Sequence, residues 1–353
     1  MRLGLVGFPQ TGRTTLFSAL TGRSADDQRP GRAHIASLAV PDARLDRLVA
    51  IYASRKRVPA SIEIEDLPAI SPPGRAPGPA AGQAFSDMRA CDALVFVIRA
   101  FENDLVPHHR DRPDPKQDLA DLEAELVLAD LDVCSRRIAR LEKDIHKPLP
   151  NQADLKAELA VLERCAAALE AGDRIDTLNL HGADERVTRS IQFLSARPRV
   201  VVFNVGEAAA REPDPDLAAV PGSKQICAAL ERDLAELDEA DRGDFMAEYR
   251  LDELAGPRVV RLAYDVLHAV TFYTAAENEA RAWILTRGED AVAAAGKIHT
   301  DLASGFIRAE VVAFEHLDAA GSVREAKAQG HVRTEGRDYV VKDGDVLFIL
   351  FSK

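Results

Sequence analysis

The first fifteen residues constrain the fold more than any other segment. An apolar run at residues 3–6 leads into G-F-P-Q-T-G-R-T-T at residues 7–15, after which apolar positions are spaced as in a helix. Strand, turn and helix in this order, with the spacing G-x-x-x-x-G-[basic]-[Ser/Thr], predict a phosphate-binding loop. Glycine lets the backbone approach phosphate, and the helix start adds partial positive charge. The usual lysine is Arg13 here, so we expect weaker or altered nucleotide binding, because a guanidinium is bulkier and planar.

Charge and composition narrow the classes of function. The 353-residue chain is long enough for two or three domains and carries a net charge of -12, which argues against a generally basic nucleic-acid binder. No apolar run approaches the roughly 18 residues that a membrane helix needs, so no membrane partner is expected. The four cysteines lack metal-ligand spacing, which favours reduced thiols in a cytoplasmic protein.

The pattern along the chain predicts three parts. Alternating strands and helices predict an α/β nucleotide-binding domain over residues 1–112 and 174–268. Two long amphipathic helices, separated by K-P-L-P-N at 147–151, predict an antiparallel helical hairpin inserted at 113–173. The strand-rich end predicts a small α+β domain over 269–353. The strands expected in these parts are 3–6, 35–40, 61–65, 93–98, 200–203, 224–227, 280–285, 307–314, 338–341 and 346–351.

Polar residues that follow predicted strands extend the candidate site. Asp66 follows a strand of alternating pattern, where a carboxylate can hold Mg²⁺ together with the Thr14 hydroxyl; a turn cap before Pro68 is the simpler alternative. Asn204 and Glu207 follow another buried strand, and an amide with a carboxylate can read the edge of a purine. The full set expected to bind the nucleotide is Gly7, Pro9, Gln10, Thr11, Gly12, Arg13, Thr14, Thr15, Asn204, Val205, Glu207, Cys227 and Ala228.

Three histidines are weaker candidates. His108 and His109 are adjacent rather than helically spaced, which favours a solvated loop over a metal site. His299, on a predicted helix over 291–299, is expected to be a surface or capping residue rather than a catalyst.

The chain resembles the YchF/Obg-like ATPase family of P-loop GTPases along nearly its whole length. The family's loop G-L-P-N-V-G-K-S-T matches residues 7–15, and its N-x-x-E motif matches Asn204 to Glu207. The hairpin segments E-L-V-L-A-D-L-D and K-A-E-L-A-V-L-E are similar to the family's insert. The runs G-K-I-H-T-D, G-F-I-R-A-E and Y-V-V-K-D-G-D-V resemble its TGS domain. This resemblance implies an ATP-preferring, Mg²⁺-dependent switch or hydrolase that associates with ribosomes or RNA.

Departures from the family's pattern cluster at the predicted site. Arg13 replaces lysine, and Gln10 replaces an asparagine associated with a monovalent cation. The phosphate-sensing turn D-x-A-G reads D-L-P-A at residues 66–69, where Ala69 adds a Cβ and Pro68 lacks an N–H. The first switch segment, 27–34, lacks a threonine, and the second, 71–82, is rich in Pro and Gly and is expected to be a long loop. A hydrophobic residue, Ile70 or its neighbour, stands where many GTPases orient water with glutamine.

Two functional hypotheses follow. The first is a purine-nucleotide-binding protein that prefers ATP over GTP and hydrolyses it slowly. The second is a non-hydrolysing pseudo-GTPase that acts as a scaffold through the hairpin and the TGS-like domain. Because residues 265–353 are slightly acidic, any RNA contact of that domain must come from a local basic cluster, for which the candidates are Lys297, Arg308, Arg333 and Arg337.

Overall fold

The computed structural model describes residues 1–23, 34–74, 81–147 and 150–352. Residues 27–33 of the first predicted switch segment and 75–80 of the second therefore lie outside the described residues. The chain forms two compact units, which we call the N-terminal unit (Arg2–Ala36 and Ile64–Ala255) and the C-terminal unit (Met1, Ser37–Glu63 and Gly256–Lys353). Residues 37–63, assigned from the sequence to the nucleotide-binding domain, thus group with the C-terminal segment.

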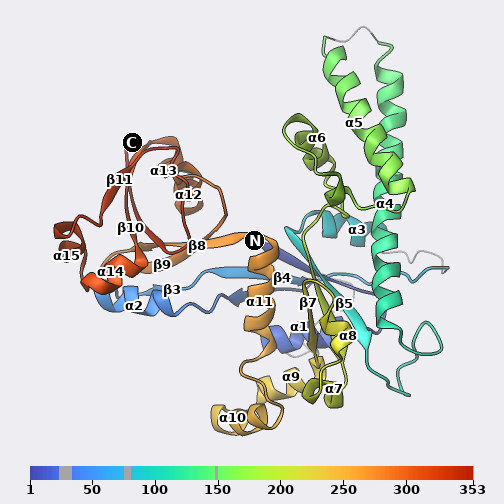
Figure 1. Cartoon of the computed structure of the whole chain (residues 1–353), viewed down its shortest axis with the longest axis horizontal. Coiled ribbons are helices and arrows are strands. Elements are labelled where there is room, and N and C mark those ends of the chain that lie inside the picture. The colour runs from blue at the N-terminus through green and yellow to red at the C-terminus, as the bar shows by residue number, and fades with distance from the viewer. Residues whose placement is uncertain (24–33, 75–80, 148–149, 353) are drawn as a thin grey trace. The chain divides into compact units, whose positions relative to one another are not determined.

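A six-stranded sheet of order β2-β4-β1-β5-β6-β7 organises the nucleotide-binding fold (Figure 1). Strands β1, β5, β6 and β7 pair in parallel, as expected for strands connected by helical crossovers. All but the last residue of β5 are buried, which explains the unbroken apolar run at residues 93–98. The strands are β1 (Arg2–Val6), β2 (His34–Ala39), β4 (Ser61–Asp66), β5 (Ala93–Ala100), β6 (Arg199–Val205) and β7 (Ser223–Ile226).

Helices follow the strands of this sheet in the chain. Helix α1 begins directly after the glycine-rich loop and buries Leu16, Phe17 and Leu20. The helices are α1 (Arg13–Thr21), α3 (Ala81–Arg89), α6 (Ala183–Ile191), α7 (Glu207–Arg211), α8 (Pro215–Ala218), α9 (Ala228–Glu236) and α10 (Glu239–Glu248), with a 3₁₀ helix, η2 (Ile175–Leu178).

The predicted helical hairpin is confirmed as α4 (Pro115–Asp144) and α5 (Gln152–Glu170) (Figure 1). The two helices share an apolar core in which Cys134, Leu141, Leu162 and Cys165 are fully buried. Burial raises the pKa of the Cys134 thiol to about 12 and that of the Cys165 thiol to about 11, so both thiols stay protonated.

Asp130 ties the base of the hairpin to the N-terminal unit. This side chain of α4 is fully buried, and its carboxylate accepts hydrogen bonds from the backbone N–H groups of Leu194 (2.9 Å) and Ser195 (2.7 Å). The Ser195 hydroxyl (2.8 Å) and Arg89 Nη1 (2.8 Å) also donate to it. A buried carboxylate with four donors, one of them cationic, has its hydrogen-bonding requirement met.

The C-terminal unit contains a second sheet, of order β11-β10-β12-β8-β9-β3. Its core includes Phe272, Leu285, Ala309 and Leu347. Its elements are α2 (Ala43–Tyr52), β3 (Arg57–Val58), β8 (Ala269–Ala275), β9 (Ala280–Thr286), α12 (Ala291–Ile298), α13 (Thr300–Ser304), β10 (Phe306–Ala313), α14 (Phe314–Ala320), α15 (Val323–Ala328), β11 (Arg333–Glu335) and β12 (Asp345–Phe351), preceded by α11 (Ala255–Val266).

Segment 37–63 contributes to this unit through a polar network. Arg44 donates to both oxygens of Asp42 at 3.0 Å and to Asp343 Oδ2 at 2.7 Å, and Tyr273 donates to Asp42. Strand β3 pairs in parallel with β9. The network therefore joins residues almost 300 positions apart in the sequence.

Most predicted elements are present, but one strand prediction was wrong. Residues 338–341 form only an isolated bridge, between Val340 and Asp290. None of the helices in the described part of the chain is long and apolar enough to cross a membrane.

Candidate nucleotide-binding site

The glycine-rich loop lies between β1 and α1, where the strand order of the sheet reverses on either side of β1. Gln10 and Gly12 have φ angles of 62° and 85°. A Cβ on Gly7 would lie 2.5 Å from the carbonyl oxygen of Val97, and one on Gly12 would lie 2.2 Å from Asn204 Nδ2. Both glycines are therefore required by space, and Gly12 also by its conformation. Ligands of α/β sheets bind at such a reversal point.

Asn204 holds the loop in place from a neighbouring strand. It lies within β6 and is 5% exposed. Its Nδ2 donates to the carbonyl oxygen of Thr11 at 2.9 Å, and its Oδ1 accepts from the N–H of Ala228 at 3.0 Å. The side chain thus bridges the loop and the start of α9. This bridging role was not evident from the sequence, which suggested contact with the base.

The other residues that were predicted to bind the nucleotide differ in how deeply they are buried. Thr11 is buried and donates to the carbonyl oxygen of Phe8 at 3.1 Å. Cys227 precedes α9 and is buried, as are Val205 and Ala228, whereas Pro9 and Gln10 are exposed and Thr15 is half-buried.

Thr14 and Asp66 meet beside the loop, as predicted for a metal site. The Thr14 hydroxyl donates to Asp66 Oδ2 at 2.7 Å, and Asp66 is 7% exposed at the end of β4. Asp66 Oδ1 has no hydrogen-bond partner within the described part of the chain. Hydroxyl and carboxylate oxygens are ligands that Mg²⁺ accepts, with water and phosphate completing its shell, so this donor set fits the ion.

Arg13 lies against the same carboxylate. Its Nε is 3.7 Å from Asp66 Oδ1, and its side chain is 13% exposed. Burial lowers the pKa of the Arg13 guanidinium, an effect that Asp66 opposes. Ile70 is also buried beside the loop, and its N–H donates to the carbonyl oxygen of Gly7 at 3.2 Å.

Glu207 lies apart from this polar cluster. It is exposed at the start of α7, and its Oε2 accepts from the Tyr249 hydroxyl at 3.2 Å. The structure therefore joins Asn204 to the loop, whereas no hydrogen bond between Glu207 and the loop is present in the described residues.

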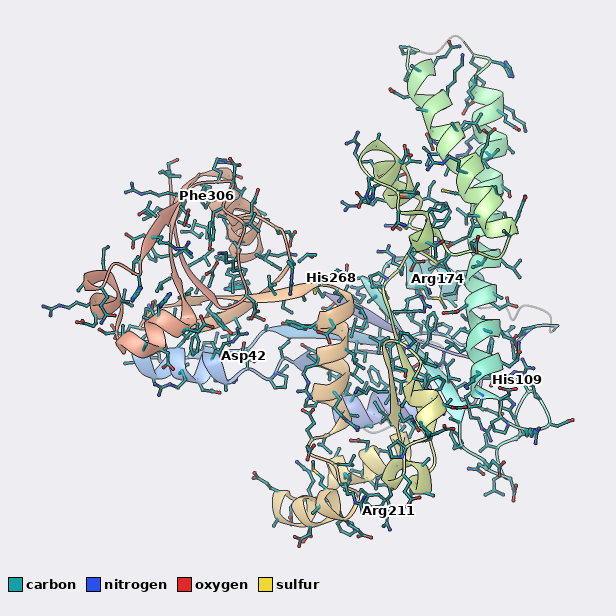
Figure 2. The ribbon with its side chains drawn as sticks, in the orientation of Figure 1. Asp42, His109, Arg174, Arg211, His268 and Phe306 are labelled. Atoms are coloured by element: carbon teal, nitrogen blue, oxygen red, sulfur yellow. The ribbon has the colours of Figure 1, made fainter. Side chains whose placement is uncertain are left out.

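The interpretation of His108 and His109 as a solvated loop was wrong. Their side chains are 4% and 11% exposed, and their Nε2 atoms lie 2.9 and 3.2 Å from the oxygens of Asp118. His109 also packs edge-on against Phe8 of the glycine-rich loop, with ring centroids 5.3 Å apart (Figure 2 labels His109). Arg110 Nε already donates to Asp118 at 3.1 Å, so a cation adjoins the carboxylate. Burial lowers the pKa of His109, with Asp118 opposing that effect.

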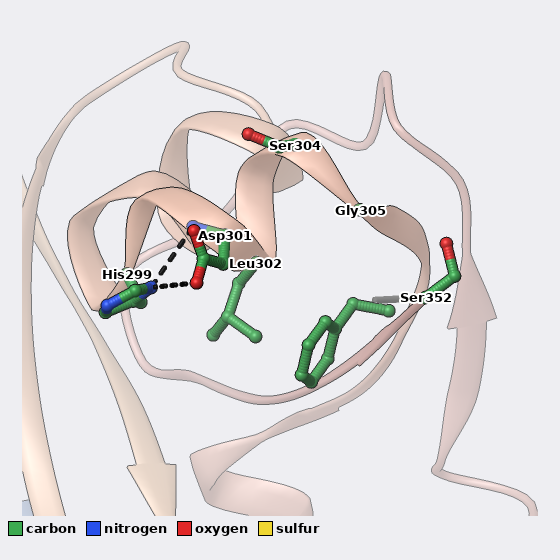
Figure 3. Close-up of a pocket in the computed structure, with 7 residues that line it drawn as sticks. His299, Asp301, Leu302, Ser304, Gly305 and Ser352 are labelled. Carbon is green, nitrogen blue, oxygen red and sulfur yellow. Dashed lines mark hydrogen bonds and ion pairs between the residues drawn. The ribbon is translucent and has the colours of Figure 1, made fainter.

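The C-terminal unit holds a separate hollow of about 820 Å³, lined in part by His299, Leu302 and Phe351 (Figure 3). The prediction that His299 is a surface or capping residue is confirmed, because it is exposed and its Nδ1 accepts from the N–H of Asp301 at 3.1 Å at the start of α13.

The candidate basic residues of this unit differ in their surroundings. Lys297 and Arg308 are exposed on α12 and β10. Arg333 lies 3.3 Å from Glu335 and donates to the Tyr339 hydroxyl at 3.0 Å, and Arg337 donates to the carbonyl oxygen of Phe306 at 3.1 Å. Two of the four side chains are thus already engaged.

Fold and site together define a P-loop α/β protein with a helical hairpin and an α+β C-terminal segment. Comparison with known proteins agrees. The YchF-GTPase_C family model, described as a protein of unknown function (DUF933), matches residues 269–352. The chain is 37% identical to the ribosome-binding ATPase YchF of Escherichia coli O157:H7, over 99% of both chains, and 32% identical to the Obg-like ATPase 1 of Oryza sativa, over 100% of this chain and 92% of the relative.

A solved structure supports the same assignment. The Schizosaccharomyces pombe YchF GTPase superposes with a TM-score of 0.84 at 26% identity, over 99% of this chain and 97% of that one. The GTP binding protein of Pyrococcus horikoshii, at 18% identity and a TM-score of 0.61, shares the fold. The chain belongs to the YchF/Obg-like ATPase family.

Proposed function

We propose that this chain is a cytoplasmic, ribosome-associated regulator that binds purine nucleotide with Mg²⁺, prefers ATP over GTP and hydrolyses it slowly. The observation that carries the nucleotide proposal is the loop at residues 7–15. Its two sterically required glycines and the bridge from Asn204 hold the backbone curled at the start of α1. A curled backbone at a helix N-terminus favours phosphate.

Mg²⁺ would be held by Thr14 and Asp66. When bound, it would neutralise phosphate charge. The Thr14–Asp66 hydrogen bond orients the carboxylate, and Asp66 Oδ1, which has no hydrogen-bond partner in the described residues but lies 3.7 Å from Arg13 Nε, would face the ion or one of its waters.

The base preference is proposed from the resemblance and from Glu207. A carboxylate one methylene longer than aspartate changes the reach toward guanine N–H groups, which disfavours GTP. Glu207 is exposed and contacts Tyr249, so its replacement does not open a core.

Titration calorimetry tests the nucleotide proposal. Nucleotide-stripped protein is titrated with nonhydrolysable ATP and GTP analogues in Mg²⁺, and micromolar binding with ATP preferred is expected. Glu207→Asp should reduce the preference for ATP over GTP. Glu212→Asp, a matched exchange at an exposed position just after α7, should leave that preference unchanged. Absence of heat for both analogues, with the protein folded, would refute nucleotide binding.

The ribosome proposal rests on the relative named a ribosome-binding ATPase and needs its own test. Co-sedimentation with purified ribosomes, with and without the ATP analogue, should retain the protein in the pellet. A protein that stays in the supernatant under both conditions would contradict it.

The scaffold alternative has one observation in its favour. The Nε end of the Arg13 guanidinium faces Asp66 Oδ1, at 3.7 Å, rather than the phosphate side of the loop. A pseudo-GTPase would bind the analogue without detectable phosphate release from ATP over hours, and single-turnover assays with γ-labelled ATP distinguish it from a slow hydrolase.

A further inference from the structure

The Arg13 side chain folds back across the glycine-rich loop. Its Cδ would lie 3.5 Å from a Cβ on Gly7, and its Nε is 3.7 Å from Asp66 Oδ1. The guanidinium is therefore the cation next to the carboxylate that would also hold Mg²⁺. A lysine ammonium is a compact point charge, whereas the guanidinium spreads its donors over a planar fork.

One end of this guanidinium has an unmet requirement. Nη1 of Arg13 is buried and has no hydrogen-bond partner among the described residues. A buried cationic donor without an acceptor is unfavourable, and a phosphate oxygen is the acceptor that the loop would bring nearby. Because the guanidinium is a planar fork, Nε can remain at Asp66 while Nη1 donates to phosphate.

The same geometry opposes divalent cations. An ion bound to Asp66 Oδ1 would lie next to the guanidinium, and like charges at such distances repel. The Thr14 and Asp66 oxygens still fit Mg²⁺, but the ion must displace Arg13 or tolerate its charge.

We propose that Arg13 is the resident counter-cation of this loop, so that nucleotide binding by this chain depends only weakly on Mg²⁺. The inference rests on the proposed function, because it concerns how the proposed phosphate site is neutralised. In this proposal Arg13 sets how strongly nucleotide binding depends on a divalent cation, and is not simply a substitution that weakens binding.

Calorimetric titration with AMP-PNP, in EDTA and in excess Mg²⁺, tests this inference. For the unmodified chain the Kd should change by less than about threefold, whereas Arg13→Lys should bind at least about tenfold more tightly with Mg²⁺ than without it. Arg13→Gln should lose at least about tenfold in affinity in EDTA. Arg23→Lys, the same exchange just beyond the end of α1, is the matched control, because Arg23 is exposed and its side chain donates to a backbone carbonyl, that of Ile35, at 3.1 Å.

A second readout does not depend on the nucleotide Kd. Mn²⁺ titrated into the AMP-PNP complexes and followed by electron paramagnetic resonance should bind more tightly to Arg13→Lys than to the unmodified chain. Circular dichroism and thermal unfolding establish that each variant is folded.

The outcomes separate the two proposals. Binding by the unmodified chain that improves tenfold or more with Mg²⁺, or equal Mn²⁺ affinity in both proteins, would overturn the role of Arg13 and leave nucleotide binding intact. Folded protein that binds AMP-PNP under neither condition would overturn both.

Discussion

Replacement of Asn204 by alanine is the sharpest test of how this loop is held. The variant leaves two backbone groups without partners, the carbonyl of Thr11 and the N–H of Ala228, and both residues are buried. Each buried group left unsatisfied costs about 1–3 kcal/mol, so the free energy of unfolding should fall by about 2–6 kcal/mol. For a folding unit of about 150–250 residues, each kcal/mol lowers the melting temperature by about 2–4 °C, so the melting temperature of the N-terminal unit should fall by at least about 4 °C.

Urea unfolding followed by circular dichroism measures this loss, and AMP-PNP titration measures its effect on the site. Asn204→Asp keeps an acceptor for Ala228 but removes the donor to Thr11 and buries a carboxylate against the Thr11 carbonyl oxygen, so its loss of stability should be at least that of Asn204→Ala. Asn151→Ala is the control, because Asn151 is exposed and makes no side-chain capping bond to α5. A loss below about 1 kcal/mol for Asn204→Ala, with unchanged AMP-PNP affinity, would refute the bridging role.

Three further changes have defined expectations. Gly12→Ala places a Cβ 2.2 Å from a buried amide at φ 85°, so urea unfolding should show a loss of at least about 2 kcal/mol. Asp130→Asn replaces one carboxylate oxygen by an NH₂ group, so buried donors such as Arg89 lose an acceptor, and the free energy of unfolding should fall by about 3 kcal/mol in the same assay. Asp132→Asn, at an exposed position, should change it little. The pKa of His109 is lower in the folded protein than in the unfolded chain, so the unfolded chain binds the proton more tightly. The stability of the fold should therefore fall as the pH drops below about 6.5. Thermal unfolding at a series of pH values measures this loss, and His109→Gln should reduce it.

The sequence predicted the fold class and the position of the loop because both depend on local patterns. The run 93–98, which lies in β5, could be recognised as a buried strand because successive residues of a strand point to opposite faces and all of these residues are apolar. The helices of the hairpin, α4 and α5, were evident from their spacing. The family assignment followed from long matching runs rather than from the loop alone.

Other features depended on contacts between distant residues. Nothing near His109 in the sequence indicated burial, because its partners, Phe8 and Asp118, come from the loop and from the first turn of α4. Asn204 was recognised as polar at a strand end, but its bridge depends on two other elements. A two-residue strand such as β3 has too few positions for a pattern to identify.

The grouping of Ser37–Glu63 with the C-terminal segment bears on how this protein can be dissected. A fragment cut at the limits of the matched family, 269–352, would lack α2 and β3 and would leave the hydroxyl of Tyr273 without Asp42. Conversely, a truncation at residue 268 would remove β8 and β9, the strands against which α2 packs. Neither fragment contains all the residues of its folding unit. A chimera between relatives must exchange residues 37–63 and 256–353 together to preserve the Arg44–Asp343 pair.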